Sequence, residues 1–209
     1  MIPDSLYPYP GIVVPNHSDW TKVHYPEKIL EFRKNPLNEH DVVFLGNSIT
    51  EGGGSWAARF NDSTIRNRGI SGDVTAGVLE RLGEIWYSKP REVFILIGIN
   101  DMWNEALSAD YIASNIIKIA AVIHSNSPHT KLYVQTILPT SFEKLTVKIK
   151  AVNDILKSNA SKKSYLLIDL HSFFADEKDL IIKEYTVDGV HLTDNGYKQW
   201  VSVVKEYVK

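Results

Sequence analysis

Runs of apolar residues alternate along this chain with longer segments in which apolar and polar residues recur with a helical period. The runs at 41–45, 92–98 and 164–170 are short and rich in aliphatic and aromatic residues. Such runs are typical of strands that are buried on both faces of a sheet. Together with 63–69 and 131–138, they predict five strands.

Helical periodicity marks the segments between these strands. In 73–86, apolar residues recur at intervals of three and four, which places them on one face of a helix. Ser108 or Asp110 is a suitable cap for one further helix, and Thr193 or Asp194 for the last. Helices are expected at 25–36, after Ser48 with 55–60 inside it, and at 73–86, 108–125, 144–160 and 193–208.

The order of these elements predicts an α/β fold. Strands alternate with helices five times, which favours a parallel sheet with helices on both faces. We therefore expect a three-layer α/β/α architecture with five parallel strands in the flavodoxin-like order 2-1-3-4-5. Residues 1–26 are rich in Pro and Tyr and lack a period, so we expect an extended segment there. We expect a single domain over residues 1–209, with residues 1–40 as an N-terminal extension and short helix packed on it.

Composition and charge narrow the possible partners. The chain has 209 residues, of which 44% are hydrophobic and 23% charged, as is ordinary for a globular protein. It has no cysteine, which excludes disulfides and thiolate metal sites. The net charge is -2 with dispersed Lys and Arg, so we expect no nucleic-acid partner. No apolar run approaches the ~20 residues that span a bilayer, and no signal peptide is visible at the N-terminus. We therefore expect a soluble protein without a membrane partner.

The stretch VVFLGNSITEGGG, residues 42–54, ends an apolar run in a polar, glycine-rich break that is typical of a strand-to-helix turn. Ser48 in this turn could be a phosphate-loop hydroxyl, a helix cap or a nucleophile. A phosphate loop needs a Gly-Lys-Ser/Thr ending and a dinucleotide site needs G-x-G-x-x-G, and neither is present. The α/β-hydrolase motif G-x-S-x-G also fails, because Ile49 and Thr50 follow the serine.

Three glycine-containing loops are expected to meet beside Ser48. In an open parallel sheet, ligands bind outside the carboxyl ends of the strands, where the strand order reverses. The first strand lies between the second and third in the expected order, so the loops 46–48, 69–73 and 98–101 converge. A hydroxyl beside backbone N–H groups and the Asn100 amide provides the parts of a nucleophile with an oxyanion hole.

The segment TVDGVHLTDNGY, residues 186–197, offers the base that such a nucleophile needs. Asp188 lies three residues before His191, and on a turn a carboxylate at this spacing can accept a hydrogen bond from the imidazole Nδ1. The opposite ring nitrogen is then free to take a proton from a serine. The pattern alone does not place this loop over the first strand.

Four blocks of this sequence resemble those of the SGNH hydrolases, also called GDSL-type esterases. The resemblance runs from about residue 41 to the C-terminus, and the order and separations of the blocks match. The phrases NRGISGD and DGVHLT resemble the branch that holds the platelet-activating-factor acetylhydrolase subunits and bacterial acyl- and acetylesterases. Asn47 replaces the aspartate that is usual in the first block, and we expect it to brace the turn without abolishing activity. The blocks are Gly46-Asn47-Ser48, Gly72, Gly98-x-Asn100-Asp101 and Asp188-x-x-His191.

The resemblance implies a serine esterase that needs no cofactor and acts on a small-molecule ester. In it, Ser48 is the nucleophile, His191 the general base and Asp188 the residue that orients His191. The backbone N–H groups of Ser48 and Gly72 and the Asn100 amide form the oxyanion hole. Each residue also has a structural alternative, such as a helix cap for Ser48 or a turn former for Asp188.

The substrate expected from the resemblance is a small acyl ester, with acetyl on a carbohydrate or similar polar alcohol as the first choice. A lysophospholipase or thioesterase of the same family is the nearest alternative. A catalytically silent carbohydrate-binding protein is the alternative from another class. The sequence does not indicate an oligomeric state.

Several other residues receive secondary roles. We assign Asn47, Trp56 and Trp103 to substrate binding. Asp73 and Asp101 are expected to cap helices or brace loops. The histidines other than His191 lack the spacing of metal ligands, so no metal is expected.

Overall fold

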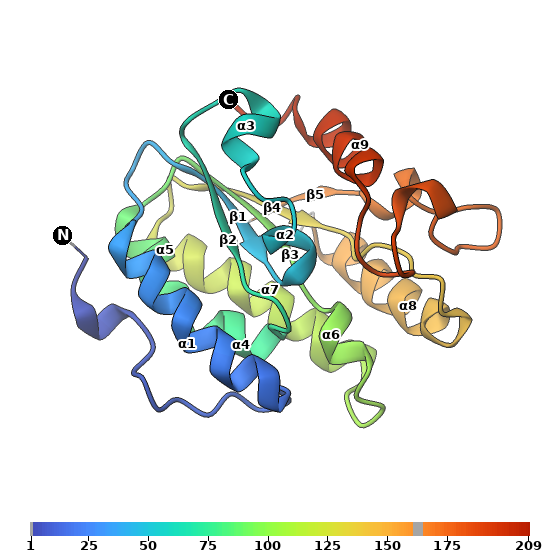
Figure 1. Ribbon diagram of the computed structural model, residues 1–209, viewed down its shortest axis with the longest axis horizontal. Helices are drawn as coiled ribbons and strands as arrows, with labels where there is room; N and C mark the ends of the chain where they lie inside the picture. The colour runs from blue at the N-terminus through green and yellow to red at the C-terminus, as the bar shows by residue number, and fades with distance from the viewer. Residues whose placement is uncertain (1, 161–164) are drawn as a thin grey trace.

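The strands pair side by side and all in the same direction. A computed structural model describes residues 2–160 and 165–209 and contains one five-stranded parallel sheet in the order β2-β1-β3-β4-β5 (Figure 1). This order and the parallel pairing confirm the predicted fold class. Ser164, the first residue of the last predicted strand, lies outside the described residues. The strands are β1 Val42–Gly46, β2 Ile65–Gly69, β3 Glu92–Leu96, β4 Lys131–Gln135 and β5 Leu166–Ile168.

The register of the sheet brings three loops to one place. Gly46 at the end of β1 pairs with Gly69 at the end of β2 and with Leu96 at the end of β3. The chain therefore leaves all three strands at the same level of the same edge. The short helices α2 (Ser48–Glu51) and α6 (Ile99–Met102) begin there.

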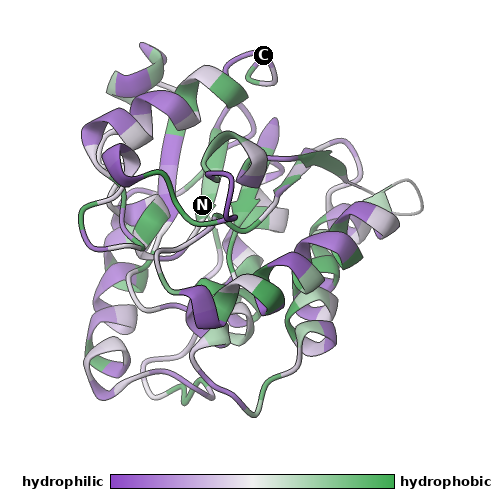
Figure 2. Cartoon of the chain, turned by 90° about the vertical axis from the view of Figure 1, so that its right-hand side faces the viewer, coloured by the Kyte–Doolittle hydropathy of each residue, from purple (hydrophilic) through white to green (hydrophobic). Residues whose placement is uncertain are grey.

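Helices cover both faces of the sheet. Figure 1 shows α3 (Trp56–Phe60) and α9 (Asp194–Val204) on one face and α7 (Ala109–Asn126) and α8 (Glu143–Ala160) on the other. Figure 2 shows strands that are largely green at the centre of the molecule and helices whose colours alternate between purple and green. This is the amphipathic pattern expected of helices that pack on a buried sheet.

Aromatic side chains link the sheet to its helices. Phe44 of β1 stacks on Trp56 at 4.3 Å and on Phe94 of β3 at 4.9 Å between ring centroids. Trp56 in turn meets Trp200 of α9 edge to face at 4.8 Å. Offset and edge-to-face aromatic pairs of this kind stabilise a core beyond the area that they bury.

The N-terminal region contains a longer helix than the sequence predicted. α1 spans Asp19–Lys34, because the Ser18 hydroxyl accepts a hydrogen bond from the Thr21 N–H and starts the helix there. We predicted extended chain up to residue 26, which is wrong: Pro26 lies inside the helix. α1 packs through Tyr25 and its neighbours against the loop that follows β2, in a second apolar cluster of the chain.

The predicted helix over 73–86 is two helices. α4 (Thr75–Glu80) and α5 (Leu82–Ser88) are separated at Arg81, whose backbone leaves the helical region. The Arg81 guanidinium is buried, and it donates to Asp73 at 2.9 Å and to the Gly46 carbonyl at 2.9 Å. The break lets this cation reach the end of β1.

The remaining elements are short. The 3-10 helices are η1 Asp4–Leu6, η2 His171–Phe173 and η3 Lys183–Tyr185. Within residues 2–160 and 165–209, no helix has the length and apolar character needed to cross a membrane.

Candidate active site

Ser48 lies at the start of α2, directly after β1. The Asn47 side chain caps this helix, because its Oδ1 accepts a hydrogen bond from the Ile49 N–H at 3.1 Å. Gly46 is required just before it, since a Cβ there would overlap the Thr50 side chain and the Leu96 carbonyl. The local sequence thus turns the chain sharply and leaves the Ser48 side chain partly exposed.

His191 reaches Ser48 from the far end of the chain. The His191 Nε2 lies 3.0 Å from the Ser48 Oγ, and the His191 Nδ1 lies 2.7 Å from the Asp188 Oδ2. A carboxylate can only accept, so Nδ1 carries the proton and Nε2 faces the serine hydroxyl as an acceptor. The structure therefore brings together the three residues that the sequence placed in one site, across 143 positions of chain.

The turn 188–191 holds Asp188 through several donors. Its Oδ1 accepts hydrogen bonds from the backbone N–H groups of Val190 at 2.9 Å and His191 at 2.8 Å. Partial burial alone would raise the pKa of Asp188, but the hydrogen bonds from the His191 ring and these N–H groups outweigh it and lower the pKa to about 2. Gly189 takes a φ of 92°, in the region that favours glycine. Asp188 is therefore ionised at neutral pH and can stabilise an imidazolium beside it.

Two backbone N–H groups near Ser48 are left without partners. In the part of the chain that the structure describes, neither the Ser48 N–H nor the Gly72 N–H donates a hydrogen bond. Gly72 has a φ of 79°, and a Cβ at this position would overlap the Thr21 side chain of α1. Both residues are partly exposed, so these N–H groups are available to a ligand.

Asn100 completes the group of donors. It lies in the first turn of α6, and its Nδ2 donates to the Asp73 carbonyl at 2.9 Å. This bond uses one of the two amide hydrogens and fixes the side chain beside the loop that carries Gly72. The second amide hydrogen has no partner among the described residues.

A carboxylate that the sequence did not single out braces the Gly72 loop. The Glu51 Oε2 accepts hydrogen bonds from the Ser71 N–H at 2.6 Å and from the Ser71 hydroxyl at 2.5 Å. The His24 Nε2 lies 3.1 Å from the same oxygen. Burial opposes ionisation, but the bonds from Ser71 and His24 outweigh it and lower the pKa of Glu51. α2 thus carries Ser48 at one end and, one turn later, the anchor of the neighbouring loop.

The two aspartates expected to brace loops do so. Asp73 is fully buried and accepts from His17 at 3.0 Å and from Arg81 at 2.9 Å. Asp101 accepts from the Thr75 hydroxyl at 2.6 Å and from its N–H at 3.0 Å, which caps α4. Burial raises the pKa of Asp101 to about 6. Asp73 holds the loop after β2 that carries Gly72, and Asp101 ties α6, which carries Asn100, to the start of α4.

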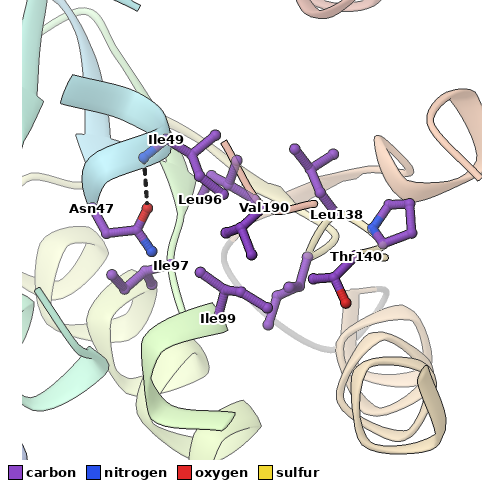
Figure 3. Close-up of a pocket in the computed structure, with 10 residues that line it drawn as sticks. Asn47, Ile49, Leu96, Ile97, Ile99, Leu138, Thr140 and Val190 are labelled. Carbon is purple, nitrogen blue, oxygen red and sulfur yellow. Dashed lines mark hydrogen bonds between the residues drawn. The ribbon is translucent and has the colours of Figure 1, made fainter. Parts of the chain in front are cut away.

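A narrow apolar cavity adjoins the nucleophile. Figure 3 shows Ile49, Val190 and Leu138 pointing toward one another, with Asn47 at the edge. The cavity measures about 10 Å³, which is close to the space that one water molecule needs. Its walls include the two residues that flank Ser48 and the residue that precedes His191, and the others come from the segments 96–99 and 137–140.

The three residues predicted to bind substrate lie in different environments. Trp103 is 42% exposed and packs edge to face on Phe142 at 5.0 Å, beside the site. The assignment of Trp56 is wrong: it is 1% exposed, and its indole N–H donates to the Thr50 carbonyl. The reason is that α3 lies on a face of the sheet, so Trp56 faces the core. Asn47 is buried at the edge of the cavity, where it caps α2.

Nothing in the described residues is arranged as a metal centre. Over residues 2–160 and 165–209, no group of three or more His, Cys, Asp and Glu side chains could hold a metal ion. His17 and His24 are bound to carboxylates, as described above.

Most of the chain matches a known protein family, and solved structures share its fold. Residues 44–199 match the GDSL-like lipase/acylhydrolase family. A solved structure from Streptococcus pneumonia, described as a platelet activating factor, is 26% identical with a TM-score of 0.81, and the match covers 91% of this chain and 95% of that one. A GDSL-like lipase from Bacteroides thetaiotaomicron is 26% identical with a TM-score of 0.73, and the match covers 90% of this chain and 96% of that one.

A curated relative is similar over part of its length. The chain is 25% identical over 179 residues to the N-acylneuraminate cytidylyltransferase of Escherichia coli, and the match covers 81% of this chain. The chain spans only 40% of that relative. The family match, in contrast, extends over three quarters of this chain, from the Ser48 turn to the last helix. The chain therefore belongs to the GDSL-like lipase/acylhydrolase family, the SGNH hydrolases.

Proposed function

We propose that the chain is a carboxylic ester hydrolase in which Ser48 is the nucleophile and His191 is the general base. The observation that carries the proposal is the 3.0 Å distance between the Ser48 Oγ and the His191 Nε2, with Asp188 on the other ring nitrogen. The hydroxyl proton moves to Nε2 as Oγ attacks the ester carbonyl. Asp188 stabilises the imidazolium that forms.

The oxyanion is held by three donors in this proposal. They are the N–H groups of Ser48 and Gly72 and the free amide hydrogen of Asn100. His191 then gives its proton to the departing alcohol oxygen, and an acyl-enzyme ester on Ser48 remains. Water attacks that ester with His191 again as the base, and the carboxylic acid and the free serine are regenerated.

The acyl group in this proposal is small, with acetyl first, and the alcohol is a carbohydrate or similar polar molecule. The support for a small group is the cavity of about 10 Å³ between Ile49 and Val190, which leaves little room for a long chain. The support for a carbohydrate is the curated relative, which is named for N-acylneuraminate, an acylated sugar.

A panel of p-nitrophenyl esters of rising chain length, measured beside acetylated sugars, tests the acyl group. We expect kcat/KM to be highest for acetate and to fall as the chain grows, because a longer chain must open the apolar cavity. A preference for decanoate over acetate would overturn the small-acyl proposal and favour a lysophospholipase or thioesterase.

A further inference from the structure

A large groove lies next to the site, and the mechanism above does not use it. The groove has a volume of about 570 Å³ and runs between the α6–α7 loop and the first half of α8. Small-molecule sites measure roughly 300–1,000 Å³, so the groove has the size of a ligand site. Its lining includes Trp103, Leu107, Lys144, Val147 and Lys148.

The groove begins close in the chain to Asn100, one of the proposed oxyanion donors. Trp103 follows Asn100 by three residues at the end of α6, and residues three apart on a helix share a face. Trp103, which lines the groove, therefore lies one helical turn from Asn100.

Residues 141 and 142 connect the groove to the turn that carries His191. Phe142 packs on Trp103 at 5.0 Å, and the Ser141 N–H donates to the Gly189 carbonyl at 2.9 Å. A Cβ on Gly189 would lie 3.3 Å from the Phe142 ring. The Phe142–Trp103 pair therefore connects the His191 turn to the groove.

The lining combines apolar surface with charge. Leu107 and Val147 offer aliphatic contacts, while the Lys144 Nζ lies 5.1 Å from the centre of the Trp103 ring. The Lys148 Nζ donates to the Asn104 carbonyl at 3.0 Å, which fixes a cation in the wall. Sugar rings present C–H faces to aromatic and aliphatic groups and hydroxyls to charged ones, so this mixed wall suits a carbohydrate.

We propose that this groove binds the carbohydrate from which the acyl group is removed, and that it selects an oligosaccharide over a monosaccharide. The inference rests on the proposed function. The departing alcohol oxygen must lie beside His191 to receive its proton, and from there the Phe142–Trp103 pair leads into the groove. The acyl group stays on Ser48 when the alcohol leaves, so the two ends of the substrate separate at this residue.

The test compares acetylated monosaccharides with acetylated trisaccharides of xylose, glucose and N-acetylglucosamine, beside p-nitrophenyl acetate. We expect kcat/KM for the preferred trisaccharide to exceed that of its monosaccharide by about tenfold, which corresponds to ~1.4 kcal/mol. Val147→Arg places a long cation in the groove at a side chain that is 80% exposed. It should lower the ratio of trisaccharide to p-nitrophenyl acetate activity by a similar factor.

The matched control is Val23→Arg, another exposed valine, which lies on α1 away from the groove. It should leave all rates unchanged. A second variant, Trp103→Ala, should raise KM for the trisaccharide more than it lowers kcat, and Trp103→Phe should restore part of the affinity.

The following results would contradict either the groove assignment or the proposed function. Equal kcat/KM for mono- and trisaccharides in every series, or a Val147→Arg enzyme with an unchanged ratio, would overturn the groove assignment while esterase activity persists. If the enzyme prefers p-nitrophenyl decanoate and Val147→Arg blocks its hydrolysis, the groove binds an acyl chain instead. Failure to hydrolyse any of these esters, p-nitrophenyl acetate included, would instead remove the proposed function on which the groove rests.

Discussion

At the residue scale, two properties set Ser48 apart: its hydroxyl faces an imidazole nitrogen, and its backbone N–H is unpaired within the described residues. In the proposed mechanism, the first property increases the nucleophilicity of the oxygen, and the second prepares a donor for the charge that its attack creates. Both depend on the turn that Gly46 and Asn47 make possible.

Asn100→Ala tests the oxyanion donors. Removing one such donor costs on the order of 10²- to 10³-fold in kcat, and we expect KM for p-nitrophenyl acetate to change little. Steady-state kinetics on this ester give both values. Asn104→Ala is the control, since this asparagine lies four residues on and its side chain bonds to Asn16 and to the Ala106 N–H, away from the loop that carries Gly72. A fall in kcat of less than threefold would argue against a role for the Asn100 amide.

The pH dependence of stability tests the environment of Asp188. Its pKa in the folded protein is about 2, below the ordinary value of 3.8, so folding favours the ionised form. The stabilisation is therefore complete above about pH 4 and is lost as the pH falls toward 2. Urea unfolding of the native protein and of Asp188→Asn should give a difference in unfolding free energy that shrinks as the pH falls from 4 toward 2. A difference that grows as the pH falls would contradict this sign.

At the element scale, α2 couples the nucleophile to the oxyanion loop. Ser48 begins the helix and Glu51 ends it, and Glu51 holds Ser71 next to Gly72. A change at Glu51 should therefore act on catalysis without touching substrate.

Glu51→Ala should lower kcat by about tenfold with little change in KM, because lost charge-assisted bonds worth roughly 1.5–3 kcal/mol let the Gly72 N–H move. Glu51→Gln keeps an oxygen for Ser71 and should recover part of the rate. Glu80→Ala, on the exposed side of α4, provides the control. If KM rises while kcat is retained, the brace does not act through the oxyanion donors.

The helices and strands also show which parts of the fold can be predicted from the sequence and which cannot. The strands and their order follow from short apolar runs that alternate with helical segments, and the structure confirms them. The start of α1 and the break at Arg81 depend on a cap and on a buried cation that contacts β1, and hydropathy alone does not encode these contacts. Such contacts routinely override the secondary structure that a hydropathy pattern predicts.

The candidate site, too, can be predicted only in part from the sequence. Glycine, serine, aspartate and histidine at fixed spacings predict which residues meet, since the parallel sheet brings its loops to one edge. Glu51 was not predicted, because its partner Ser71 lies 20 positions away and no local spacing marks the pair. Trp56 was misplaced because the side on which a short helix packs is decided by the sheet, not by its own sequence.

At the scale of the whole molecule, one aromatic core joins the sheet to α3 and α9, and a second apolar cluster joins α1 to the loop after β2. That loop carries Gly72, so the N-terminal region is tied to the site. We propose that residues 1–209 form a single cooperative domain.

Equilibrium unfolding in urea tests this proposal. The five tryptophans lie in the N-terminal helix, in the core and near the groove, so fluorescence reports on all three regions. We expect the fluorescence and far-ultraviolet circular dichroism transitions to coincide at one midpoint. Two separated transitions, with Trp20 fluorescence changing first, would indicate that the N-terminal region unfolds on its own.

Labelling with a serine-directed fluorophosphonate tests the central claim most directly. The reagent loses fluoride as a serine oxygen attacks phosphorus, so intact mass and peptide mapping locate the adduct. We predict one adduct, on Ser48, and a labelling rate that falls on the order of 10³-fold or more in His191→Ala. Labelling on another residue, or an unchanged rate in His191→Ala, would contradict the account.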